Sequence, residues 1–171
     1  MGDVGQERPV GWQAEAIAGF TRSELFERTF QEGMELVEET AAYLDGAGRQ
    51  DSKLLSRSAA LAYASESMRL TTRLMQVASW LLVQRAVREG DMAPELALDA
   101  GYRLGSEHDS RSAEAAEALP APLSALLDRS ERLFERVRHL DSRMYLDASA
   151  DDAPPHPVLS QLERLKDAFG S

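Results

Sequence analysis

One uninterrupted helical stretch decides the fold: RSAALAYASESMRLTTRLMQVASWLLVQRAVRE, which runs from Arg57 to Glu89. Neither proline nor glycine breaks it. We expect the helix to begin near Ser56 or Ser58 and to end at Gly90, because serine is typical of the first position of a helix and glycine of the position after the last. At about 1.5 Å per residue, this helix is a rod on the order of 50 Å long.

Apolar residues lie on several sides of this helix. One stripe holds Leu61, Ala64, Met68, Thr71, Met75, Ala78 and Leu82, and a neighbouring stripe holds Tyr63, Ser67, Leu70, Leu74, Val77 and Leu81. Beyond residue 77 a third side becomes apolar as well. A helix that is apolar all round must be covered all round, and two partner helices cover only part of it. The remainder is capped by the loop after Gly90 or buried in a dimer. The candidate core or dimer contacts are Met75, Trp80, Leu81, Val83 and Val87.

A second helix is predicted before this one, from Thr21 to Gly46. Thr21-Arg22-Ser23-Glu24 fits a capping box, in which the Thr21 hydroxyl accepts from the third amide and Glu24 reaches back. Its buried seam is expected at spacings of four and three, through Phe26, Phe30, Gly33, Val37, Thr40 and Leu44. We expect a flexible arm over residues 1–20 and a turn-forming loop over residues 45–52.

A third long helix is predicted from Pro120 or Pro122 to about Leu146. Its seam repeats at three and four residues through Leu123, Leu126, Ser130, Leu133, Val137, Leu140 and Met144. Before it, Pro94 begins a short helix, and residues 101–118 form a mobile connection. Together the three long helices predict an all-α, up-down-up three-helix bundle over residues 21–146.

The chain ends in a linker and a short amphipathic tail. Residues 147–157 are rich in proline, alanine and aspartate, and residues 158–171 carry an apolar quartet: Leu159, Leu162, Leu165 and Phe169. Such a unit is near the lower limit of about 12–15 residues for an isolated helix in water. It therefore either docks as a fourth helix or binds a partner.

Charge and composition exclude several classes of partner. With 19 basic and 29 acidic residues the net charge is −10, which disfavours nucleic acid and anionic membranes. Cysteine is absent, so thiolate chemistry and disulfides are excluded. No stretch approaches the roughly 20 apolar residues of a membrane span, and the N-terminus lacks a signal peptide. We expect a cytoplasmic protein that does not insert into membranes.

Residue patterns for catalysis or cofactor binding are missing. The histidines are His108, His139 and His156, and they are expected on the surface. Glu135 and His139 occur once and at spacing four, whereas a carboxylate-bridged metal bundle repeats Glu-x-x-His on two helices. The acids Glu32, Glu35, Glu38 and Glu39 form either a cation site or, by preference, a solvated helix face. The sequence therefore predicts no enzyme, cofactor or metal.

Two arginines within the long helix allow two interpretations. Arg69 and Arg73 lie among serines and threonines on a helix that is otherwise largely apolar. They either make hydrogen bonds between helices in the bundle core or form an arginine-rich face for a partner. The first interpretation is preferred, because serine and threonine suit close helix approach.

Two long strings resemble a known family. EGMELVEETAAYLDGAGRQDSK (Glu32 to Lys53) and RSAALAYASESMRLTTRLMQVASWLLVQRAVREGDM (Arg57 to Met92) are similar to the RcdA family, the regulators of CtrA degradation of alphaproteobacteria. The resemblance covers about residues 24–104 closely and the third long helix more loosely.

The resemblance implies a function without catalysis. It implies a dimeric bundle that acts as an adaptor, bringing substrates such as CtrA to the ClpXP protease at the cell pole. The expected partners are ClpXP primed by a receiver-domain protein, a cyclic-di-GMP-binding adaptor, substrate proteins and a second copy of the chain. A dimeric scaffold or anti-adaptor, which binds signalling proteins without promoting degradation, is the alternative.

Overall fold

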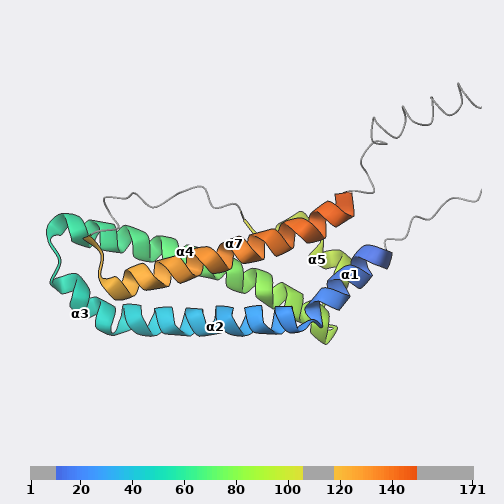
Figure 1. Cartoon of the computed structure of the whole chain (residues 1–171), viewed down its shortest axis with the longest axis horizontal. Coiled ribbons are helices and arrows are strands. Elements are labelled where there is room, and N and C mark those ends of the chain that lie inside the picture. Colours follow the sequence, from blue (N-terminus) through green and yellow to red (C-terminus); the bar gives the residue numbers. More distant parts are fainter. Residues whose placement is uncertain (1–10, 106–117, 150–171) are drawn as a thin grey trace, which may run out of the picture.

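A computed structural model describes residues 11–105 and 118–149 of the chain (Figure 1). The long helices are α2 (Glu24–Asp45), α4 (Arg57–Glu89) and α7 (Ala121–Ser149). The short elements are α1 (Gly11–Thr21), α3 (Ala47–Lys53), α5 (Pro94–Ala97) and the 3-10 turn η1 (Ala100–Tyr102). The described ranges contain helices and no strand, so the predicted all-α bundle is confirmed.

The direction of α7 corrects the expected up-down-up order. Arg73 on α4 contacts Ser130 on α7, and further along both helices Trp80 contacts Asp141, so α4 and α7 are parallel. The pairs Glu39–Arg129 and Glu32–Arg136 show that α2 is antiparallel to α7 (Figure 1). The order is therefore up-down-down. The reason is the connection: about thirty residues between α4 and α7 span at most about 100 Å, enough to return along the whole rod.

The N-terminal region also differs from the prediction, because residues 11–21 form α1 rather than part of a flexible arm. Ile17 is buried, and the Phe20 ring lies 5.7 Å from that of Phe26, centroid to centroid, in an edge-on arrangement. The Thr21 hydroxyl donates to the Ala18 carbonyl within α1. Ser23 is instead the cap of α2, accepting from the Phe26 amide at 3.2 Å.

The ends of the long helices are largely as predicted. Ser56 caps α4 through the Ala59 amide, and Gly90 ends the helix in the left-handed region at φ 80°. Gly46 ends α2, but the expected loop after it contains the short helix α3. Helix α7 begins after Pro120 and keeps its predicted seam, with Leu123, Leu126, Ser130, Leu133 and Val137 buried. Leu140 and Met144 are half-buried.

The main core lies between the three long helices. Its buried side chains include Phe26 and Leu36 of α2, Leu70 and Leu81 of α4, and Leu133 of α7. A smaller cluster of Ile17, Val87 and Ala97 closes the end of the bundle where α1 and α5 pack. The third apolar side of α4 is therefore covered at this end by α1 and by the segment after Gly90, one of the two arrangements expected.

Some of the residues for which the sequence makes predictions lie outside the described ranges. These residues are His108, His156, most of the connection 101–118, and the tail residues Leu159, Leu162, Leu165 and Phe169.

Candidate interaction surface

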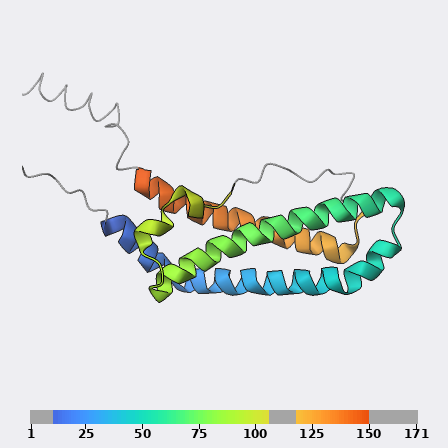
Figure 2. The same cartoon turned by 180° about the vertical axis from the view of Figure 1, so that it is seen from behind.

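One line of large apolar side chains on α4 faces solvent. Leu61, Met68, Met75 and Leu82 are 68%, 73%, 65% and 52% exposed. They repeat every seven residues, which is nearly two helical turns, so they lie along one side of α4. We call them the α4 ridge. Figure 2, seen from behind, brings α4 in front of α7.

The exposed residues of α4 itself along the ridge, from Leu61 to Leu82, are uncharged apart from the partly exposed Arg69. The ridge is about 32 Å long at 1.5 Å per residue. Small residues, Ala64 and Thr71, are exposed between the large ones. The charged residues in this part of α4 point elsewhere: Glu66 is buried, Arg73 is buried and Arg69 pairs with Glu66 at 3.2 Å. An apolar strip of this length on a chain of charge −10 is typical of a protein contact.

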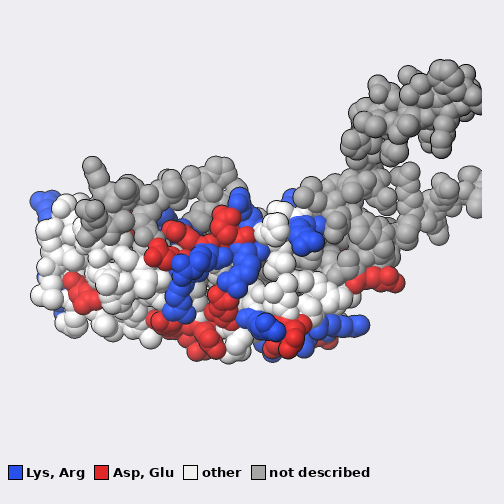
Figure 3. Space-filling model, viewed as in Figure 1, with Lys and Arg blue, Asp and Glu red and all other residues white. Residues whose placement is uncertain are grey.

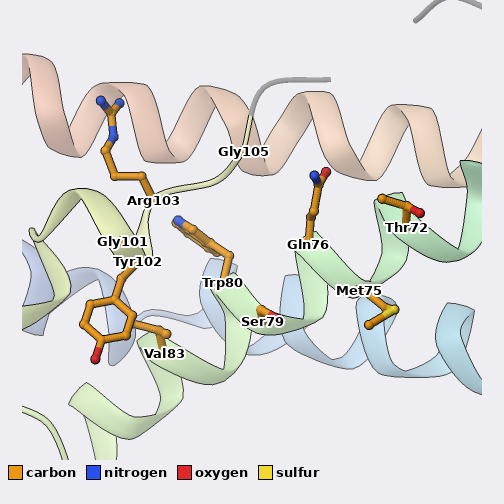
Figure 4. Close-up of a pocket in the computed structure, with 10 residues that line it drawn as sticks. All are labelled: Thr72, Met75, Gln76, Ser79, Trp80, Val83, Gly101, Tyr102, Arg103 and Gly105. Carbon is orange, nitrogen blue, oxygen red and sulfur yellow. The ribbon is translucent and has the colours of Figure 1, made fainter. Parts of the chain in front are cut away.

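Two hollows flank Met75 in the middle of the ridge. On one side, a hollow of about 430 Å³ lies between α4 and the η1 segment (Figure 4). On the other side, a hollow of about 290 Å³ lies between α2 and α4. We call them the α4/η1 hollow and the α2/α4 hollow. Met75 lines both, so the ridge separates two depressions that apolar side chains of a partner can enter.

A buried carboxylate holds the wall of the α4/η1 hollow. The Trp80 indole N–H donates to Asp141 Oδ1 at 3.0 Å, and Arg103 Nη2 donates to Asp141 Oδ2 at 3.3 Å. In Figure 4, Gln76 and Arg103 point toward α7, whereas Met75 points away from it. Asp141 thus attaches both α4 and the η1 segment to α7. This arrangement stabilises the hollow by fixed charge-assisted hydrogen bonds.

The α2/α7 face has a different chemistry, visible at the centre of Figure 3. Arg136 donates both Nη atoms to the two carboxylate oxygens of Glu32, each at 2.9 Å. Arg129 pairs with Glu39 at 2.5 Å. Two of the four acids considered as a cation site are therefore paired with arginine. Among the described residues no group of His, Asp and Glu is placed to hold a metal ion.

The candidate core and dimer residues separate into two groups. Trp80, Leu81 and Val87 are buried within the chain and Val83 is half-buried, so the first three are core residues and have little surface for a dimer contact. Met75 is the opposite case. The prediction of core packing is wrong for it, because it lies on the outer side of α4.

The two arginines predicted within the long helix, Arg69 and Arg73, have different environments. The side chain of Arg73 is 3% exposed, its Nη1 donates to Ser130 Oγ at 2.8 Å, and Glu131 lies 3.8 Å away. Its proposed role on a partner face is wrong, because its guanidinium is satisfied between α4 and α7. Arg69 is partly exposed beside Glu66.

The α4 ridge consists of the four large residues of the first apolar stripe predicted for the long helix. The sequence predicts that this side needs cover but leaves open whether the cover comes from the chain or from a dimer. The seven-residue spacing of leucine and methionine with small residues between was the available signal, since this spacing suits an external helix partner as well as an internal one.

The fold and this surface define a class: an elongated all-α bundle with an exposed, apolar helix face. None of the described helices is both long and apolar enough to cross a membrane. A family model described as "Protein of unknown function (DUF1465)" matches residues 17–169. The solved structure of RcdA from Caulobacter crescentus CB15 is 67% identical, over 75% of this chain and 98% of that chain, with a TM-score of 0.63. The chain therefore belongs to the DUF1465 family of RcdA-like proteins, and the predicted resemblance is confirmed. No curated protein matches it.

Proposed function

We propose that this protein is a non-catalytic adaptor that delivers substrates of the CtrA class to the ClpXP protease. The proposal is supported by membership of the RcdA-like family, a resemblance that implies a role in CtrA degradation, and by the exposed α4 ridge. The ridge carries the proposal, because a row of large exposed apolar side chains about 32 Å long is unfavourable in water unless another protein covers it. The protein would act in the cytoplasm, with protease primed by a receiver-domain protein and with a cyclic-di-GMP-binding adaptor as a further partner.

We also propose that the α4 ridge forms the homodimer. In an antiparallel pair with its two-fold axis between Thr71 and Thr72, Met68 faces the partner's Met75 and Leu61 faces the partner's Leu82. Ala64 and Thr71 leave room for close approach of the two helices. The seam is thus complementary to itself, as a two-fold interface requires.

The tail after residue 157 would supply the tether for cargo. A short flexible linker raises the local concentration of a bound partner to about the mM range. Leu159, Leu162, Leu165 and Phe169 lie outside the described residues, so their assignment rests on their spacing in the sequence. An adaptor of this kind needs a rigid body and a tether, and no titrating catalytic group.

The test is a reconstituted degradation reaction with ClpXP, the priming protein and a candidate substrate. We expect the full chain to raise the degradation rate, and the chain lacking residues 158–171 to raise it less. Binding of substrate with no gain in degradation by any form of the chain would favour the scaffold or anti-adaptor instead. Turnover of a substrate by the chain alone would contradict the proposal.

A further inference from the structure

The α2/α4 hollow is lined in part by a threonine whose buried hydroxyl has no hydrogen-bond partner in the described part of the chain. Its lining is mainly apolar and includes Val37, Leu44, Leu74 and Ala78. Thr40 also lines it and is only 4% exposed, and its hydroxyl has no hydrogen-bond partner in the described part of the chain. A buried hydroxyl without a partner costs about 1–3 kcal/mol, so it needs an explanation.

Three other helical threonines satisfy their hydroxyls locally. Thr29 donates to the Leu25 carbonyl at 2.8 Å, Thr71 to the Ser67 carbonyl at 2.9 Å, and Thr21 to the Ala18 carbonyl at 3.0 Å. Thr40 makes no such bond to the preceding turn. The Thr40 oxygen is itself buried although Thr40 lines the hollow, so its side chain must turn toward a bound group before the hydroxyl can donate to it or accept from it.

One acid, Asp45, lines the hollow, and a second, Glu38, lies near it on α2 without lining the hollow. Glu38 and Asp45 are exposed and lie seven residues apart on the same side of α2, about 10 Å along the helix. Asp45 pairs only loosely with Arg49, at 3.7 Å between two exposed side chains. Glu38 takes part in no ion pair within the described ranges, in contrast to Glu32 and Glu39 on the α7 side of the same helix.

A second copy of the chain is a poor occupant of this hollow. Between Ser58 and Leu82 the basic residues of α4 are Arg69, whose side chain is 27% exposed beside Glu66, and the buried Arg73. A partner ridge therefore offers Glu38 and Asp45 no exposed basic side chain other than Arg69, which is partly exposed and already paired with Glu66. The two acids instead favour a basic partner, since opposite charges steer association with a surface and fix its register.

We propose that the α2/α4 hollow is a docking site for an amphipathic, basic helix of another protein. An aliphatic side chain of that helix enters the apolar hollow, a polar group beside it bonds the Thr40 hydroxyl, and lysines or arginines along one edge face Glu38 and Asp45. This inference rests on the proposed function only in assuming that the protein recruits partners, and it assigns the chemistry of one of them.

The experiment measures direct binding and uses no protease, so its failure is separate from failure of the adaptor function. The probe is a synthetic helix of about 18 residues, about five turns, with leucines on one face and lysines along one edge. A second peptide carries glutamates in place of the lysines. Each is titrated into the full ¹⁵N-labelled chain at about 0.1 M salt, where screening acts over about 10 Å.

We expect the lysine peptide to shift amide signals of residues 37–45 and 71–78 and to bind about tenfold more tightly than the glutamate peptide, a ratio worth about 1.4 kcal/mol. Shifts confined to other residues, or equal binding of the two peptides, would overturn the proposal.

Matched variants locate the site. Ala41 lines the hollow and Ala42 is exposed beside it without lining it, so Ala41→Trp should weaken binding about tenfold or more and Ala42→Trp should not. Thr40→Val should weaken binding about fivefold and leave the melting temperature unchanged or higher, because the lost hydroxyl had no partner. Equal binding by the two tryptophan variants, or by Thr40→Val and the unmodified chain, contradicts the assignment.

A charge swap completes the test. Glu38→Lys should transfer the preference from the lysine peptide to the glutamate peptide, whereas Glu35→Lys, with the same change in net charge on the same helix, should not. Sedimentation of each variant checks self-association. If Ala41→Trp abolishes the dimer while Ala42→Trp preserves it, the hollow belongs to the dimer contact and the proposal is wrong.

Discussion

The α2/α7 face and the α4 ridge are both exposed to water, but the first is covered with paired charged side chains and the second with large apolar ones. On the α2/α7 face, arginines of one helix pair with glutamates of the other, as Arg136 does with Glu32. Along the ridge, large apolar side chains have no cover within the described chain. The charged face is already complete in one copy, whereas the ridge is an incomplete surface. The difference indicates which side of the rod is available for assembly.

The largest expected effect comes from the inner side of α4. Trp80 is 2% exposed and bonded to Asp141, so Trp80→Glu places a carboxylate in the core beside another one. We expect a loss of about 4 kcal/mol or more, seen by circular dichroism as an unfolded chain or a much lower melting temperature. Met75→Glu, five residues away on the outer side, is the control: it should keep its helix content and lose much less stability than Trp80→Glu. Similar melting of Trp80→Glu and the unmodified chain would contradict the burial.

The next effect concerns the ridge itself. Met68→Glu with Met75→Glu brings like charges together in the proposed antiparallel seam and removes two apolar contacts. We expect self-association to weaken about a hundredfold, about 2.7 kcal/mol, with the helix content unchanged. Analytical ultracentrifugation over a range of concentrations measures it. If the variant still forms the dimer with unchanged affinity, the dimer contact lies on a surface other than the ridge.

The charged face should respond weakly. Arg136→Ala removes a bidentate pair whose side chains are both about two-fifths exposed. Such a surface pair is worth about 0.2–1 kcal/mol, and the loss should shrink as salt is raised. Chemical denaturation at two salt concentrations checks this expectation. A loss of several kcal/mol would make the α2/α7 face part of the structural core rather than a solvated surface.

The last expected effect depends on alkaline pH and lies at the end of the rod near α3. Burial, followed by the hydrogen bond to Asp51, raises the pKa of Tyr43 above its ordinary value. A raised pKa means that the folded state holds the phenol proton more tightly, so this contribution is complete below pH 10 and is lost as pH rises further. Tyr43→Phe should cost about 1 kcal/mol at neutral pH and reduce the loss of stability above pH 10. Denaturation curves at both pH values test it.

Local sequence patterns predicted the helices well, because helix caps and hydrophobic periodicity depend on residues that are close together in the sequence. Ser56, Gly90 and the α7 seam are examples. The direction of α7 was not predictable in the same way, since periodicity is identical for a helix read in either direction through the bundle. Helix α1 was missed because its packing depends on Ile17 meeting Val87 and Ala97, which are distant in sequence.

The candidate surface was predictable only in part. The pattern through Met68 and Met75 shows that one side of α4 requires cover, but it does not say whether the cover is another helix of the chain or another molecule. Arg73 illustrates the reverse error, because a charged residue in an apolar helix can be satisfied by polar groups across the core, here including Ser130 and Glu131. The role of the tail depends on residues outside the described ranges.

The shared direction of α4 and α7 has a geometric consequence for any assembly. Since α7 ends at Ser149 beside α1, both ends of the described chain leave from the same pole of the rod, opposite to α3 (Figure 1). In the antiparallel pair proposed above, the exit points of the two copies then lie at opposite extremities. Two cargoes carried this way would be kept apart by the length of the rod, and each could be presented without obstructing the other.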